Sequence, residues 1–201
     1  MKKVVLNGSD LTLDQLVAVA REHATVELAP ETVDAVKKSR GIVEKIVEEE
    51  RVVYGITTGF GSLHNVHISK EDCVQLQENL IRTHAVGDGA PLHEDEVRAV
   101  MLIRVNSLVK GVSGVRLVTV QTLIDMLNKN VVPHIPEKGS LGASGDLAPL
   151  SHMVLPMLGL GRAFYNGELM SGKEAMEKAG VKTIHLEAKE GLALNLSLIH
   201  I

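Results

Sequence analysis

The residues with the most distinctive chemistry lie in one glycine-rich segment, residues 139–152, with the sequence GSLGASGDLAPLSH. In this segment Ser144 stands between two small residues, Ala143 and Gly145. Their size allows the Gly145 amide nitrogen to approach the Ala143 carbonyl carbon, because glycine adopts strained backbone angles at low cost. Ring closure would release one water, and loss of the Ser144 hydroxyl would release a second, giving a 4-methylidene-imidazol-5-one. Since ordinary side chains act as nucleophiles, acids or bases, the segment predicts an electrophile made from the chain itself.

Asp146 follows this tripeptide and could polarise groups or shuttle protons during the cyclisation. A simpler interpretation also fits, because clusters of Gly, Ser, Asp and Pro usually mark a loop that leads into a helix. In that case Asp146 is only the N-cap of a helix that begins in the apolar residues 147–158. The tripeptide alone leaves both interpretations open, whereas the longer segment favours the electrophile.

All fourteen residues of this segment resemble the signature of the aromatic amino acid ammonia-lyase family. Three further segments match that family in the same order, namely YGITTGFG at 54–61, NLIRTHAVG at 79–87 and AKEGLAL at 188–194. The likeness extends over residues 3–194. It implies a mainly α fold, the N-terminal helical domain of the ammonia-lyase fold with short strands and hairpins, without the long central helical bundle.

The resemblance assigns roles to two further side chains. Tyr54 stands where the family has its catalytic base, and its phenol would have to ionise well below the usual pKa of about 10. On the residues alone, a tyrosine that packs its ring and bonds its hydroxyl is the simpler interpretation. His84 stands where the family recognises the substrate side chain, although a lone helical histidine is more often structural. An imidazole at this position favours histidine or tyrosine as substrate over phenylalanine.

The activity that the resemblance implies is the conversion of L-histidine to trans-urocanate and ammonia, the first step of histidine degradation. The electrophile would form autocatalytically from Ala143, Ser144 and Gly145, and no metal or soluble cofactor is expected. A tyrosine ammonia-lyase or aminomutase is the alternative within the family. An alternative of another class is a non-catalytic helical assembly fragment whose loop never cyclises.

Three other patterns are weaker. His64 and His67 have a spacing compatible with metal binding, but no cysteine or patterned carboxylate stands near them in the sequence. Residues 167–174 nearly match a phosphate-binding loop, but Glu174 occupies the position that requires Ser or Thr and would repel phosphate. The segment around Ser144 lacks the second glycine of a hydrolase nucleophile elbow, since Asp146 stands there.

The composition sets the class of protein. The chain has 201 residues, 45% of them hydrophobic, and a net charge of −4, so it suits one globular domain. Only 2% of the residues are aromatic and no Lys/Arg-rich block occurs, which argues against a nucleic-acid partner. Cys73 is the single cysteine, which excludes an intrachain disulfide and indicates a reducing compartment. No apolar stretch has the length of a signal peptide or membrane span, so we expect a cytoplasmic protein without a membrane partner. The resemblance implies a homotetramer.

Local patterns predict the elements that hold these residues. A capping box at Thr12 and Gln15 opens a helix over 13–21, and a looser cap at Ser69 opens one that ends at His84. Further helices are expected over about 30–50, 94–110, 115–129 and 171–179. We expect a strand at 3–6, an irregular loop at 54–61 and a hairpin over 162–170 around Asn166-Gly167. Pro133 and Pro136 are expected to end the regular structure before the glycine-rich loop.

The last residues depart from the family pattern. After residue 194 the family continues with a variable residue and then Asn-Gly-Thr, whose asparagine helps to bind the substrate. Here Asn195 falls on the variable position and Leu196 stands where the asparagine belongs. Residues 196–201, LSLIHI, also coincide with a translation of the start of a common sequencing adapter. We therefore expect residues 1–195 to be a truncated electrophile-bearing domain, inactive alone, and residues 196–201 to be adapter read-through.

Overall fold

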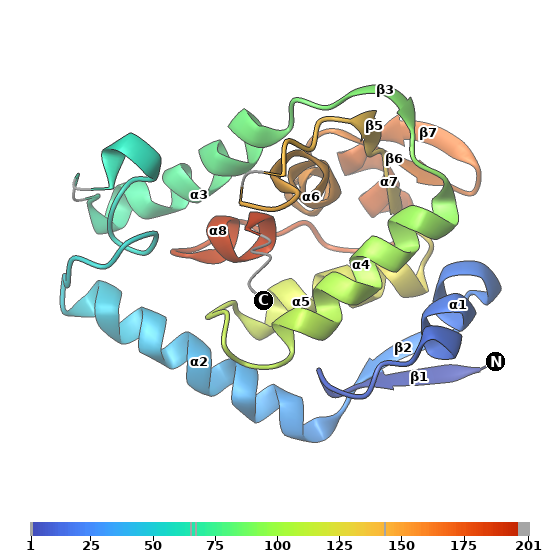
Figure 1. Ribbon diagram of the computed structural model, residues 1–201, viewed down its shortest axis with the longest axis horizontal. Helices are drawn as coiled ribbons and strands as arrows, with labels where there is room; N and C mark the ends of the chain where they lie inside the picture. Colours follow the sequence, from blue (N-terminus) through green and yellow to red (C-terminus); the bar gives the residue numbers. More distant parts are fainter. Residues whose placement is uncertain (1, 65, 67, 143, 197–201) are drawn as a thin grey trace.

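The computed structural model describes residues 2–64, 66, 68–142 and 144–196, and these form a mainly helical domain, as predicted (Figure 1). The α-helices in this part of the chain are α1 (Leu13–Glu22), α2 (Pro30–Glu48), α3 (Lys70–His84), α4 (Glu94–Leu108), α5 (Leu117–Asn128), α6 (Leu147–Val154), α7 (Gly172–Lys178) and α8 (Glu190–Asn195). Two 3₁₀ turns, η1 (Gly61–Leu63) and η2 (Leu155–Leu158), accompany them.

Short strands connect the helices at three places. Strands β1 (Lys3–Leu6) and β2 (Thr25–Leu28) are parallel neighbours, and β3 (Asp88–Pro91) pairs antiparallel with β5 (Pro136–Lys138). Strands β4 (Val132–Pro133), β6 (Arg162–Tyr165) and β7 (Glu168–Ser171) form an antiparallel sheet in the order β4-β6-β7. The expectation that Pro133 and Pro136 end the regular structure was wrong. Each proline stands at one end of a short strand, where the missing N–H removes little of the ladder.

Local capping chemistry explains where several elements begin. Thr12 and Gln15 form the predicted capping box of α1, and the Ser69 hydroxyl accepts a hydrogen bond from the backbone of α3. The hairpin between β6 and β7 turns at Asn166 and Gly167, which both have positive φ as a tight two-residue turn requires. These three sequence predictions are confirmed.

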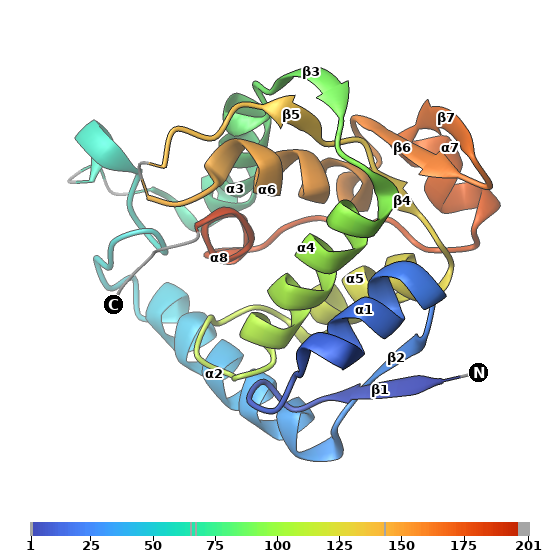
Figure 2. The ribbon, with the colours of Figure 1, turned by 45° about the vertical axis from the view of Figure 1, so that its right-hand side comes forward.

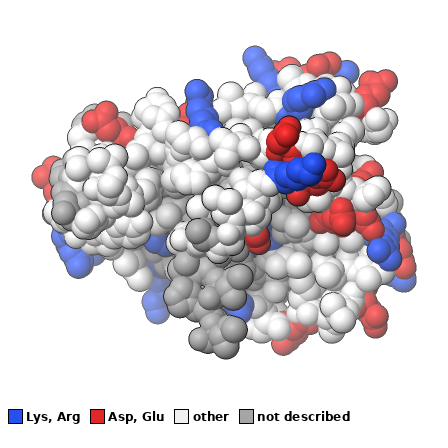
Figure 3. Space-filling view, turned by 45° about the horizontal axis from the view of Figure 1, so that its top comes forward, with Lys and Arg blue, Asp and Glu red and all other residues white. Residues whose placement is uncertain are grey.

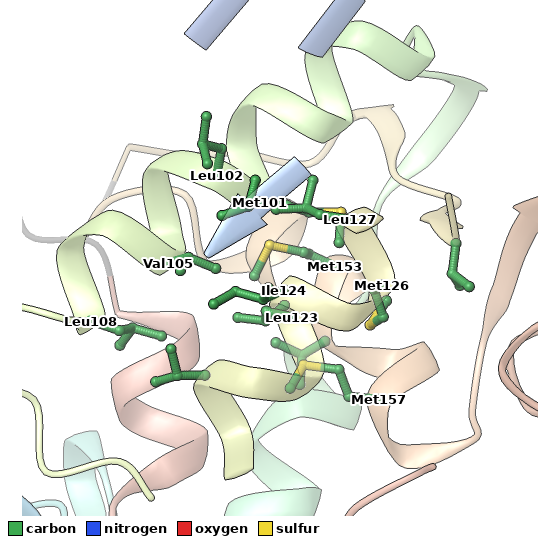
Figure 4. Packing of buried hydrophobic residues seen from close by; sticks show 14 of the residues in the cluster. Met101, Leu102, Val105, Leu108, Leu123, Ile124, Met126, Leu127, Met153 and Met157 are labelled. Carbon is green, nitrogen blue, oxygen red and sulfur yellow. The ribbon is translucent and has the colours of Figure 1, made fainter. Parts of the chain in front are cut away.

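The core is centred on the packing of α4 against α5 and on the helical segment that follows residues 139–146, the loop predicted to form the electrophile and called the electrophile loop below. Figure 4 shows Met101 and Val105 of α4 on the side toward Leu123, Ile124 and Leu127 of α5, with Met153 and Met157 in the same cluster. All of these side chains are almost completely buried. Methionine fills irregular gaps in a core that has few aromatic residues. The element that carries the electrophile loop is therefore anchored in the main core.

Arg98 lies inside this core on α4 and is 1% exposed. Its guanidinium donates to the Val19 carbonyl of α1, the Leu127 carbonyl of α5 and the Asn130 side chain. These two carbonyls belong to the last turns of their helices, where no intrahelical partner is available. Burial lowers the pKa of Arg98. One buried arginine thus holds the ends of two helices against a third.

On the face shown in Figure 3, acidic and basic side chains are interspersed, mainly toward the edges, and a broad area is uncharged. Among the helices of the described residues, none is both long and apolar enough to cross a membrane.

Candidate active site

The electrophile loop reverses direction immediately before α6. Ser144 has a φ of 59°, a left-handed conformation that is uncommon for a residue with a side chain. Gly142 and Gly145 pair across the turn, and the Gly145 amide donates to the Gly142 carbonyl at 3.4 Å. Leu141 is 93% exposed, so the loop projects from the surface of the described chain. Ala143 lies outside the described residues.

Asp146 joins the two ends of this loop. The Ser140 hydroxyl donates to its Oδ1 atom at 2.6 Å. Asp146 is at the N-cap position of α6, but its side chain makes no capping hydrogen bond to that helix. The simpler interpretation of Asp146 as a helix cap therefore accounts for its position and not for its bonding. The carboxylate instead accepts a hydrogen bond from Ser140, three residues before Ala143.

Tyr54 lies in the irregular turns that follow α2, as expected for residues 54–61. It is 55% exposed, and its ring meets Phe60 edge to face with centroids 6.3 Å apart. Among the described residues, no basic side chain hydrogen-bonds to the phenol. The next residue, Gly55, has a φ of 71° and contacts α8, because a Cβ there would lie 2.3 Å from Leu192 Cδ2. The backbone beside Tyr54 thus packs against α8.

His84 ends α3, and its hydrogen bonds define its tautomer. Its Nδ1 atom lies 2.9 Å from the Leu80 carbonyl oxygen and 3.2 Å from the Thr83 hydroxyl. A carbonyl only accepts, so Nδ1 carries a proton. No described residue hydrogen-bonds to Nε2, so in the neutral ring this atom can accept a hydrogen bond from a ligand.

Helix α8 lies beside α3 and α6 in both views of the ribbon (Figures 1 and 2). Gln77 of α3 is fully buried, and its Oε1 accepts a hydrogen bond from the Leu192 backbone. Gly191 packs so closely on Gln77 that a Cβ would come within 2.6 Å of the Gln77 carbonyl oxygen. Together with the contact between Leu192 and Gly55, α8 links the segments that carry Tyr54, His84 and the electrophile loop.

Two arginines fix the ends of α8. At its start, the buried Glu190 carboxylate accepts from the backbone and guanidinium of Arg116 and from the Thr119 hydroxyl. Burial opposes the charge of Arg116, but its hydrogen bond to Glu190 and the nearby acids outweigh this and raise its pKa. At the other end, Arg104 donates to the carbonyls of residues 193, 194 and 196. Burial lowers the pKa of Arg104 to about 10.

The segments that carry the predicted residues therefore all contact one helix, α8. Among the described residues, no hydrogen bond joins Tyr54, His84 and the electrophile loop directly. Sequence reasoning did not identify Gln77, Arg104 or Glu190. Two features of the sequence could have pointed to these residues. Glu190 lies within the matched segment 188–194, and Arg104 is a charged residue in an otherwise apolar part of α4.

The weaker metal hypothesis gains no support. His67 lies outside the described residues, and His64 contacts the Gly61 carbonyl at 3.0 Å. Within the part of the chain that the structure describes, no group of three or more His, Cys, Asp or Glu side chains could hold a metal ion.

A helical domain in which an Ala-Ser-Gly segment precedes a helix is typical of one class of protein. Comparison with protein families identifies that class. The family model for aromatic amino acid lyases matches residues 11–197, so the chain belongs to that family.

The individual relatives are more specific. The chain is 68% identical over 189 residues to a histidine ammonia-lyase of Streptococcus sanguinis strain SK36, covering 94% of this chain and 37% of the relative. It superposes on the crystal structure of histidine ammonia-lyase from Trypanosoma cruzi with a TM-score of 0.89 and 42% identity, covering 96% and 37% of the two chains. It matches tyrosine aminomutase from Streptomyces globisporus with a TM-score of 0.90 and 39% identity, covering 96% and 36%. The chain thus spans little more than a third of the length of these relatives.

Proposed function

We propose that this chain is the N-terminal, electrophile-bearing part of an enzyme that converts L-histidine to trans-urocanate and ammonia. The observation that carries the proposal is the 68% identity to a histidine ammonia-lyase over 94% of the chain. Residues 139–152, which contain the chemistry, lie within this similarity.

The loop fits the electrophile that the family forms. Ser144 has a left-handed backbone conformation, and the turn directs the Gly145 amide toward Gly142, on the other side of the tripeptide's turn. In the proposed reaction the Gly145 nitrogen bonds to the Ala143 carbonyl carbon with loss of water, and the Ser144 hydroxyl leaves as a second water. The carboxylate of Asp146, the next residue in the chain, would move the protons. Once formed, the group supplies an electrophilic carbon that makes the β-proton of the substrate removable.

Two other residues of this chain would act on the substrate. The Tyr54 hydroxyl would take the β-proton as general base. The His84 ring, with its proton held on Nδ1 by the Leu80 carbonyl, would accept a hydrogen bond at Nε2 from the N–H of the substrate imidazole. Recognition of a polar ring is consistent with histidine as the substrate.

The test uses the complete protein and its Ser144→Ala variant. The wild-type protein is expected to have a mass lower by two waters than the mass calculated from its sequence. It is also expected to produce urocanate, which is followed by its ultraviolet absorbance. The Ser144→Ala protein should keep both waters and lose activity. Ser9→Ala, at an exposed serine outside the loop, is the matched control. Deamination by Ser144→Ala at the unmodified rate would disprove the mechanism.

The alternative within the family is a tyrosine ammonia-lyase or aminomutase. The similarity to the Streptomyces globisporus tyrosine aminomutase keeps this alternative open. The two activities are separated by kcat/KM for histidine and tyrosine in the complete protein. A loop that retains both waters would instead support the non-catalytic assembly fragment.

We also propose the family's general properties for the complete protein: a homotetramer in the cytoplasm, without a metal or soluble cofactor. Light scattering would report the mass of the assembly. Activity that persists after dialysis against a chelator would support the absence of a metal, and its loss with recovery on adding metal would contradict it.

Residues 196–201 are proposed to be adapter read-through that follows a truncated domain ending near residue 195. Sequencing the source DNA across codons 189–201 tests this. A frame that continues through an Asn-Gly-Thr segment supports it, and a genuine LSLIHI sequence refutes it.

A further inference from the structure

The segment that follows His84 is packed tightly against the segment that enters the electrophile loop. A Cβ at Gly139 would lie 3.0 Å from the Gly87 Cα and 3.2 Å from the Ala148 side chain. A Cβ at Gly87 would lie 3.1 Å from the Lys138 carbonyl oxygen. A side chain at either position would require its neighbours to move by a few tenths of an ångström. The chain just after His84 and the two ends of the electrophile loop therefore meet at one point.

One side chain bonds across this point. The Gly87 amide donates a hydrogen bond to His152 Nε2 at 3.0 Å. His152 lies on α6, eight residues after Ser144, and Gly87 lies three residues after His84. An N–H donor requires an unprotonated acceptor nitrogen, so His152 is neutral in this arrangement with its proton on Nδ1. Burial, and to a lesser extent the nearby His134, lower the pKa of His152, in agreement with a neutral ring.

We propose that His152 is a positioning residue that fixes the distance between His84 and the electrophile loop through its bond to Gly87. The inference rests on the proposed function, because His84 matters only if it binds the substrate ring. The bond connects the segment between α3 and β3 to α6, a helix anchored in the core by Met153. Since a misplacement of about 1 Å can lower a rate about 100-fold, a single bond of this kind has a measurable effect.

The variants that test the proposal keep, remove or shorten the hydrogen-bond acceptor at position 152. In His152→Gln, Oε1 lies at about the reach of Nε2 and can accept the Gly87 bond. In His152→Leu there is no acceptor, and in His152→Asn the acceptor is too short to reach Gly87. His23→Gln is the control, because His23 is exposed and its Nε2 atom lies 3.7 Å from the exposed Glu94 carboxylate.

These variants are made in the complete protein and examined in three ways. Intact mass should show the loss of two waters in every variant. Hydrogen exchange at Gly87 should be faster in the Leu and Asn variants than in the unmodified protein and the Gln variant. The Leu and Asn variants should raise KM for histidine about 10-fold or more with a smaller change in kcat, and Gln should restore most of the loss.

The outcomes separate the two proposals. If exchange at Gly87 is unchanged in Leu and Asn, or if it rises while KM stays constant, the positioning role is wrong. If His152→Leu does not fold, the Asn and Gln variants decide. If the unmodified protein forms no urocanate, the proposed function fails and the positioning role with it, while the exchange data still report whether the Gly87 bond exists.

Discussion

The Glu190 carboxylate and the Arg116 guanidinium form an ion pair with a 2.7 Å separation between Oε2 and Nη2, and Glu190 is fully buried. The same carboxylate accepts from two backbone amides, those of Arg116 and Glu187. A buried charge is tolerated when its partners satisfy it in this way. The pair therefore anchors the start of α8, the helix that contacts the Tyr54 turn and α3.

Replacing Glu190 should consequently destabilise the chain strongly. Glu190→Ala leaves Arg116 without its main partner, and the expected loss is roughly 3 to 5 kcal/mol in the free energy of unfolding. The measurement is urea unfolding followed by circular dichroism. Glu177→Ala is the control, because the Glu177 carboxylate is 66% exposed and pairs only weakly with Lys173, at 3.9 Å, and it should cost about 1 kcal/mol or less. Similar losses in both variants would contradict the anchoring role.

Gly55 provides a second prediction, at the contact between the Tyr54 turn and α8. Gly55→Ala should cost about 1 to 2 kcal/mol for its positive φ and about 1 kcal/mol more for displacing the end of the Leu192 side chain. Gly61→Ala is the control, since Gly61 has a φ of 56° and no atom within 4 Å of a built Cβ. Unfolding experiments compare the two variants. Equal costs would show that Leu192 simply moves aside and does not fix the turn.

Arg104 provides a third prediction, at the other end of α8. The planar guanidinium donates to three carbonyls, whereas the single ammonium of Arg104→Lys cannot reach all of them in one geometry. The expected loss in unfolding free energy is about 2 kcal/mol, with faster hydrogen exchange in residues 190–196. Arg162→Lys, at an exposed position on β6, should change stability by no more than about 0.5 kcal/mol. Unchanged exchange in α8 would show that Arg104 does not hold its end.

Local sequence signals predicted most of the helices because capping and periodicity act over a few residues. Thr12 with Gln15, Ser69, and Asn166 with Gly167 each specify a structure through their immediate neighbours. Strands β2 and β3 were missed because each has four residues and depends on a partner distant in the sequence. Pairing between such strands is a tertiary property, and propensity predicts it poorly.

In the candidate site, too, local features could be predicted from the sequence and tertiary contacts could not. The side-chain chemistry of Tyr54, His84 and Ser144 made them candidates for a reactive site, and the resemblance to the family assigned their roles. The sequence could not show that Gln77 holds Leu192 or that His152 accepts from Gly87, because each bond joins residues far apart in the chain. The sequence analysis assigned no role to Arg98 or Arg104 of α4, and only the packed structure reveals the carbonyl groups to which they donate.

The lowered pKa of His152 leads to a prediction about pH. Burial, followed by the charge of His134, places the folded-state pKa below the usual value of about 6.5. Below pH 6.5 the unfolded chain binds a proton on this ring that the folded chain does not yet bind, so stability falls as the pH decreases. His152 therefore contributes stability that is present above pH 6.5 and is lost as the pH falls through the folded-state pKa.

Urea unfolding between pH 8 and pH 5 measures this contribution. The unmodified chain should lose more stability over that range than His152→Gln, whose amide does not titrate, because the ring must be neutral to accept from Gly87. His23→Gln should follow the unmodified chain, since His23 is exposed. Identical pH dependence in the unmodified chain and His152→Gln would mean that the ring titrates alike in both states. The neutral tautomer that the Gly87 bond requires would then not be held by the fold.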